Sequence, residues 1–167
     1  MSDTKLTIKE LAELSLLAAA SFTGKMVLSF VPNVHPVALM LIVITEVYGF
    51  KAFYCCAIYV ALEILCFGFG MWSIAYLYIW AVLVFVCLCL RKIASRLTWT
   101  AVACMHGLLF GAMCSIPYFV TGGIGAGISY WVAGIPYDLI HGLSNAVLTF
   151  LLYPVLCPLV YKLKNKA

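Results

Sequence analysis

Three polar side chains in the last third of the chain could do chemistry together. Asp138, His141 and Asn145 stand three and four positions apart, so on a helix they share one face within roughly 60°. Pro136 suits the first turn of such a helix. An acid, an imidazole and an amide on one face can line a binding site, or they can hydrogen-bond neighbouring helices together. We expect them to contact a ligand.

Lys25 and Glu63 are two more ionisable groups set in apolar surroundings. Such groups inside a membrane cost a few kcal/mol each, so they usually face a partner or a cavity. Lys25 could reach the outer interface with its long side chain, or it could pair with Glu63 or with Asp138. Glu63 could serve as a structural partner of Lys25 or contact a ligand. Glu46, close to Lys51, is expected to be an interfacial carboxylate, either solvated or paired.

Aromatic residues recur at helical spacing near these groups. Trp72, Tyr76 and Trp80 form an i, i+4, i+8 stripe. Aromatic side chains at a membrane interface often form a belt, but a deeper set can stack on a flat ligand. The predicted ligand-binding residues are Glu63, Trp72, Tyr76, Trp80, Tyr130, Trp131, Asp138, His141 and Asn145.

An enzymatic reading of the same residues is weaker. A carboxylate can orient an imidazole as a general base, but Asp138 and His141 share one helix turn. No serine or cysteine nucleophile stands in a recognisable motif, and none of the eight cysteines forms a C-x-x-C pair. Buried cysteines behave as small hydrophobic residues. We therefore predict no catalytic residues, no metal site and no cofactor in this chain.

The composition requires a membrane around these groups. Hydrophobic residues make up 66% of the 167 residues and charged residues 10%, and the mean hydropathy is +1.12. A soluble domain carries roughly 25% charged residues. These values exclude a soluble globular domain, a disordered chain and a nucleic-acid-binding protein. They predict an integral membrane protein.

The apolar stretches predict an all-α membrane protein that forms a single domain with six transmembrane helices. A spanning helix needs about 20 apolar residues. The glycine-rich run Gly122–Gly127 is expected to be a loop, and Pro154 and Pro158 to kink or end the last helix. The predicted helices cover about 10–30, 36–48, 52–67, 72–90, 99–119 and 130–153.

The positive charges fix the predicted orientation. With both termini in the cytoplasm, every Lys and Arg except Lys25 falls in an inner segment, as the positive-inside rule requires. An odd number of spans would spoil this pattern. The outer side would then carry the connection with Asn33 and His35 and the glycine-rich run, which we expect to form a lid.

The chain shows no sign of driving transport by itself. It contains no internal repeat and no G-x-x-x-x-G-K-[ST] nucleotide-binding loop. Its first predicted helix is rich in small residues, which let another helix approach closely. The residues predicted to dock a partner subunit are Ser15, Ala19, Ala20 and Gly24.

Together these features resemble the substrate-binding S component of energy-coupling factor (ECF) vitamin transporters. The resemblance covers nearly the whole chain and is strongest in the run from Gly134 to His141, with Val31–Pro36 before the second helix. It implies a protein of the bacterial cell membrane that captures a vitamin or related micronutrient at the outer face. A transmembrane coupling subunit and two cytoplasmic ATPase subunits, which use ATP, would be its partners.

Two other functions stay open. One is a stand-alone ion-coupled transporter or channel in which Lys25, Glu46 and Glu63 are coupling groups. The other is an intramembrane enzyme that uses Asp138 and His141. Dependence of flux on an ion gradient, or turnover of a bound compound, would distinguish these from a binding subunit.

Overall fold

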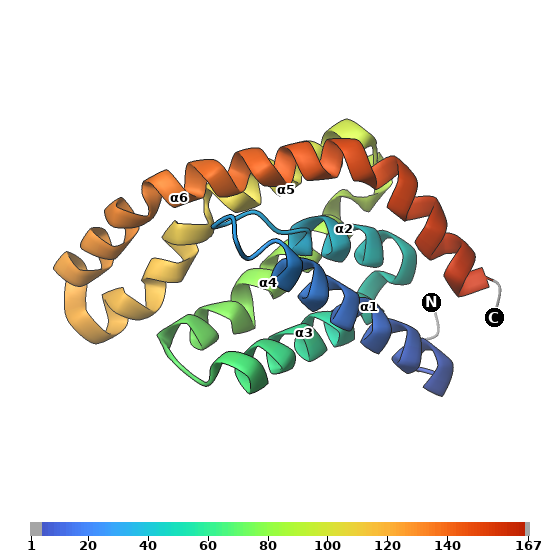
Figure 1. Ribbon diagram of the computed structural model, residues 1–167, viewed down its shortest axis with the longest axis horizontal. Helices are drawn as coiled ribbons and strands as arrows, with labels where there is room; N and C mark the ends of the chain where they lie inside the picture. Colours follow the sequence, from blue (N-terminus) through green and yellow to red (C-terminus); the bar gives the residue numbers. More distant parts are fainter. Residues whose placement is uncertain (1–4, 166–167) are drawn as a thin grey trace.

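The computed structural model describes residues 5–165, and over these residues the chain is helical and contains no strand (Figure 1). Lys166, one of the positive residues assigned to the inner side, lies outside this range. The elements in order are α1 (Ile8–Val27), α2 (Val37–Tyr48), the 3-10 turn η1 (Gly49–Lys51), α3 (Ala52–Phe67), α4 (Met71–Leu90), the 3-10 turn η2 (Arg91–Ile93), α5 (Arg96–Leu108) and α6 (Phe110–Asn165).

Helix α2 is the centre of the fold. Every residue of α2 except Glu46 is buried, which is the behaviour of a helix that is apolar on all sides. The other helices pack around it, and the chain reverses at Gly49, whose φ is 62°, to begin α3 (Figure 1). At 12 residues, α2 is about 18 Å long at 1.5 Å per residue, shorter than a bilayer core.

A long hairpin corrects one expectation. Its first arm is α5 with the part of α6 before Gly123, and its second arm is the rest of α6. The glycine-rich run is helical, and only Gly123, with φ 76° and ψ −175°, leaves helical geometry. The last helix therefore starts directly after Gly123 rather than near residue 130. The two arms come very close, because a Cβ on Gly107 would lie 2.6 Å from the backbone nitrogen of Gly142.

The C-terminal part of α6 is a second correction. The helix does not end at Pro154 or Pro158 but continues to Asn165, and it bends as it does so (Figure 1). After the bend it crosses the end of α2, where Lys164 Nζ donates a hydrogen bond to the carbonyl of Val47 at 2.9 Å. The Val47 carbonyl, in the last turn of α2, thus gains a cationic partner from α6.

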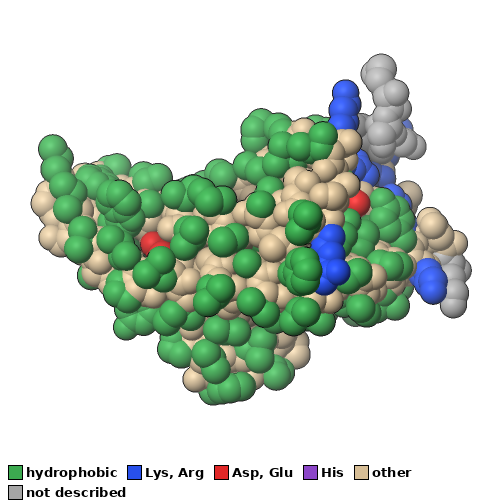
Figure 2. Space-filling view, turned by 90° about the horizontal axis from the view of Figure 1, so that it is seen from above, with side chains coloured by type: hydrophobic (Ala, Val, Ile, Leu, Met, Phe, Trp, Pro, Cys, Tyr) green, Lys and Arg blue, Asp and Glu red, His purple; other side chains and the backbone are tan. Residues whose placement is uncertain are grey.

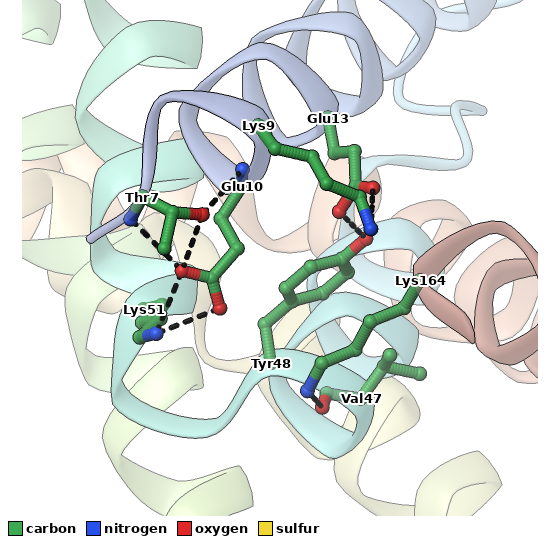
Figure 3. A network of polar contacts seen from close by, with 8 residues as sticks. All are labelled: Thr7, Lys9, Glu10, Glu13, Val47, Tyr48, Lys51 and Lys164. Atoms are coloured by element: carbon green, nitrogen blue, oxygen red, sulfur yellow. Dashed lines mark hydrogen bonds and ion pairs between the residues drawn. The ribbon is translucent and has the colours of Figure 1, made fainter. Parts of the chain in front are cut away.

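One end of the molecule is charged. Lys and Arg side chains gather in one half of the face seen in Figure 2, and the other half is largely hydrophobic. Figure 3 shows how this end is joined: Lys51 Nζ donates to both oxygens of Glu10 at 2.7 and 2.8 Å, and Tyr48 donates to Glu13 at 2.8 Å. We call this group, Thr7, Lys9, Glu10, Glu13, Val47, Tyr48, Lys51 and Lys164, the charged-end network.

Glu46 lies beside this network. Its position in the sequence suggested a possible pair with Lys51, but the two side chains are not paired. Its Oε2 accepts hydrogen bonds from Trp99 Nε1 at 2.8 Å and from Tyr153 at 2.6 Å. A buried tryptophan and a tyrosine thus satisfy the carboxylate, which links α2 to α5 and α6.

Three helical segments are long and apolar enough to cross a membrane: Val37–Phe67, Met71–Ile93 and Arg96–Asn165. The first comprises α2, η1 and α3, and the third comprises α5 and α6. These segments indicate a membrane protein. Six spans with cytoplasmic termini remain a prediction, although the predicted ranges for the second, third and fourth helices agree with α2, α3 and α4 to within one residue.

Candidate functional site

The connection between α1 and α2 lies near the middle of the molecule beside α6, at the other end of α1 from the charged-end network (Figure 1). Asn33 holds the connection in place with its side chain and its backbone. The side chain donates to the carbonyl of Tyr137 at 3.3 Å, and the backbone carbonyl accepts from Ser144 at 3.0 Å. Its φ of 58° is a left-handed conformation that asparagine tolerates better than most residues. The connection is therefore tied to α6 at this residue.

Two neighbouring cavities lie under this connection. The first, of about 300 Å³, is lined on the α1 side by Lys25, His35 and Tyr76. The second, of about 460 Å³, is lined on the α6 side by Tyr130 and Asp138. Pro32, Asn33 and Phe110 line both. We call them the Lys25 cavity and the Asp138 cavity.

Phe110, at the junction of α5 and α6, is the centre of the surrounding aromatic cluster. Its ring centroid lies 4.8 Å from that of His141, 5.5 Å from that of Trp80 and 6.0 Å from that of Tyr76. Most of these contacts are edge-on, the geometry that aromatic rings prefer. A flat ligand in either cavity would contact the Phe110 ring.

All three histidines of the chain converge here from separate elements. The His35 and His141 rings are 4.8 Å apart, and His106 lies 5.4 Å from Trp80. His141 has no hydrogen-bond partner at either ring nitrogen, and His35 and His106 each lack one at Nδ1 within residues 5–165. Among these residues no three His, Cys, Asp or Glu side chains are placed to hold a metal ion. Of the three histidines, only His35 lines one of the two cavities, the Lys25 cavity.

Asp138 lies in the wall of the Asp138 cavity, where it contacts Gly111. Its Oδ1 accepts the backbone N–H of Gly111 at 2.8 Å. Its Oδ2 has no partner within the described range, although Asp138 is only 6% exposed. A buried polar atom left unpaired costs about 1–3 kcal/mol. The carboxylate thus lies at the cavity wall with one oxygen hydrogen-bonded and the other without a partner among the described residues.

The sequence left open which residue Lys25 pairs with, and in the structure its partner is Glu63. Lys25 Nζ lies 2.6 Å from Glu63 Oε2, and Tyr59 donates to the other carboxylate oxygen at 2.7 Å. Both oxygens of Glu63 are therefore occupied. Lys25, rather than Glu63, is the charged group that reaches the cavity wall.

The remaining predicted ligand residues lie at different distances from the cavities. Trp80 is fully buried and its Nε1 is unpartnered within the described residues, whereas Trp72 packs on Tyr76 at 5.2 Å between ring centroids. Asn145 is buried and donates to the carbonyl of Ala103 at 3.4 Å. Trp131 is 43% exposed and lines neither cavity. Their roles in binding stay predictions.

The residues predicted to dock a partner divide between two surroundings. Ala19 and Ala20 are exposed and Ser15 is half-buried. Gly24 faces inward, where a Cβ would lie 2.7 Å from the ring of Pro36. Gly24 therefore lets the chain turn back toward α2, and Ala19 and Ala20 are the exposed members of the predicted docking set.

Neither Phe110 nor His106 is among the ligand-binding residues predicted from the sequence. A signal was present, because His106 and Phe110 stand four apart, and so do Gly107 and Gly111, a small-residue spacing that favours close helix contact. This spacing could have indicated that the end of α5 and the start of α6 together present one aromatic and one glycine face to the later part of α6.

Comparisons with known proteins add no identification. No protein-family model matches the chain, and searches of curated proteins and of solved structures find no match either.

Proposed function

We propose that this protein is a membrane-embedded solute-binding subunit that captures a small, flat, polar molecule in the two cavities under the α1–α2 connection. One observation carries the proposal: buried polar atoms that have no partner among residues 5–165 gather around Phe110. They belong to His35, Trp80, His106, Asp138 and His141. Native interiors usually satisfy such atoms, so their concentration beside two cavities supports a ligand site.

Transport would require other subunits. The chain has no nucleotide-binding loop, and its resemblance to ECF S components supports a coupling subunit and two ATPases as partners in a bacterial cell membrane. The exposed small residues Ala19 and Ala20 of α1 offer a surface on which a transmembrane helix of the coupling subunit could pack closely. The substrate would be a vitamin or related micronutrient taken up at the outer face.

The structure gives no support to catalysis by Asp138 and His141. Asp138 Oδ2 and both His141 ring nitrogens are unpartnered within residues 5–165, so the two side chains do not share the hydrogen bond that would orient an imidazole as a base. We therefore propose a binding role for both.

A thermal-shift screen of the detergent-purified protein against vitamins and related metabolites tests the proposal. Ligand at 100 times its Kd adds about 2.7 kcal/mol of stability, so a specific ligand gives a clear, saturable increase in Tm. Vesicles are then loaded with the chain alone or with the coupling and ATPase subunits. Uptake of the ligand only in the complete, ATP-supplied vesicles is expected. Uptake at full rate by the chain alone would contradict the proposal.

A second candidate function follows from the buried Lys25–Glu63 pair, because charged groups at membrane depth often couple transport to ions. The same vesicles test it without partner subunits. Ligand flux that follows a proton or sodium gradient, and that is lost in Glu63→Gln, would favour an ion-coupled transporter.

A further inference from the structure

The two cavities under the α1–α2 connection differ in the charge of their walls. Among the described residues, the only charged side chain on the wall of the first is Lys25, and the only one on the wall of the second is Asp138. Pro32, Asn33 and Phe110 belong to both walls. A molecule that extends across Phe110 would therefore meet a cation at one end and a carboxylate at the other.

Asp138 lacks a cationic partner among residues 5–165. None of the ion pairs among residues 5–165 includes it, and its Oδ2 makes no hydrogen bond within that range. Its burial removes water as an easy partner. A buried carboxylate is stable when it is paired or hydrogen-bonded, and an ammonium or amidinium group in the Asp138 cavity would supply what is missing.

Lys25 retains donors for an anion. An ammonium carries three N–H donors, and the structure shows Lys25 making one hydrogen bond, to Glu63 at 2.6 Å. The Lys25 side chain is 22% exposed, and its Nζ lies over the rings of Phe67 and Tyr76 at 5.4 and 5.6 Å from their centroids. It is thus held at the cavity wall with two donors free.

We propose that the ligand is a zwitterion with separated charges: its cationic group contacts Asp138, its anionic group contacts Lys25, and its flat central part lies on Phe110. This inference rests on the proposed function and narrows its substrate class. A molecule with one charge would leave the opposite wall unpaired, and such a loss is a common basis of selectivity between similar substrates.

Four small probes built on one benzene ring separate the charge classes. The zwitterion is 4-(aminomethyl)benzoate, benzylamine has only the cation, 4-methylbenzoate has only the anion, and 4-(hydroxymethyl)benzamide is neutral. Dissociation constants are measured by ligand-observed saturation-transfer NMR on the protein in nanodiscs. We expect the zwitterion to bind at least about tenfold more tightly than each other probe, since hydrogen bonds to charged groups contribute about 1.5–3 kcal/mol.

Two variants assign each charge to its wall. Asp138→Asn keeps an oxygen for the Gly111 N–H but removes the charge, so it should weaken the zwitterion and benzylamine about tenfold and leave 4-methylbenzoate unchanged. Lys25→Met combined with Glu63→Gln removes both charges of the buried pair together and avoids an isolated buried carboxylate. It should weaken the zwitterion and 4-methylbenzoate and leave benzylamine unchanged.

The outcomes separate this inference from the proposed function. No binding of the zwitterion, equal affinities for the four probes, or tighter binding of a singly charged or neutral probe would overturn the inference. A metabolite identified in the thermal-shift screen that carries one charge or none would overturn it too, and would leave the proposed function standing. No ligand at all in that screen would instead contradict the proposed function.

Discussion

Asp138 owes its position in the cavity wall to the glycine opposite it. A Cβ at Gly111 would collide with both carboxylate oxygens of Asp138, and the Gly111 N–H is the hydrogen-bond donor that holds Oδ1. A larger residue at this position would push the carboxylate out of place. The free oxygen on which the proposed cation would rest therefore depends on one residue without a side chain.

Asn33 is the residue at which the connection over the cavities can be tested. Asn33→Ala removes the hydrogen bond to Tyr137 and places a β-carbon without a polar group at a φ of 58°, which costs about 1 kcal/mol or more. We predict faster ligand dissociation, by several-fold, measured by stopped-flow tryptophan fluorescence with the screen ligand. Asn33→Gly keeps the backbone conformation without strain and should show a smaller effect. Equal rates in Asn33→Ala and the wild type would show that the connection does not retain the ligand.

Spacing along one helix was enough to predict that Asp138, His141 and Asn145 share a face, and all three are buried. The spacing could not predict that His35 and Phe110 would contact this face at His141. That meeting depends on how α5 packs on α6 and on where the α1–α2 connection crosses them, which are tertiary contacts between residues far apart in the sequence.

At the scale of elements, the α5–α6 hairpin depends on close backbone contact. Gly107→Ala would place a methyl group 2.6 Å from the Gly142 backbone, and forcing extra volume into a packed interface typically costs about 1–3 kcal/mol. We predict a lower Tm in detergent. Gly125→Ala is the matched control, because its Cβ would meet nothing within 4 Å and alanine favours a helix. A Tm loss as large in Gly125→Ala would contradict this account.

The charged-end network joins α1 to the α2–α3 turn through Glu10 and Lys51, and we expect this contact to depend on pH. The hydrogen bond from Lys51 lowers the pKa of Glu10 from 4.5 to about 2. Because the folded pKa lies below the unfolded value, the stabilisation is complete above about pH 4.5 and is lost as pH falls toward 2. We predict that wild type exceeds Glu10→Gln in Tm at pH 6 and that the difference shrinks below pH 4.5. A difference independent of pH would argue that Glu10 acts through packing.

The glycine-rich run shows why element boundaries are harder to predict than element types. Its glycines indicated a loop, yet the segment is helical on both sides of Gly123, because Gly127 lies directly against the ring of Phe119 across the hairpin. Local propensity is a weak preference that tertiary packing overrides. A different contact accompanies α6 through Pro154 and Pro158, where the sequence suggested a kink or an end: Cys157 and Val160 belong to the buried core.

At the scale of the whole molecule, the separation of a charged end from a hydrophobic end (Figure 2) is the property that orients a protein in a membrane. Reporter fusions test the predicted six spans. A green fluorescent protein fused after Lys92 or at the C-terminus should fluoresce, and alkaline phosphatase fused after Gly70 should be active. Active phosphatase after Lys92, or a non-fluorescent C-terminal fusion, would contradict a cytoplasmic location for those segments.

Native mass spectrometry of the detergent-purified chain tests the central claim most directly. We predict one bound small molecule per chain, either co-purified or added from the screen, with occupancy reduced at least about tenfold in Phe110→Ala, since burial of an aromatic ring contributes several kcal/mol. Phe69→Ala, which changes an exposed residue at the α3–α4 turn, should retain the ligand. A chain that stays empty, or equal occupancy in Phe110→Ala and the wild type, would contradict the claim that these cavities bind a solute.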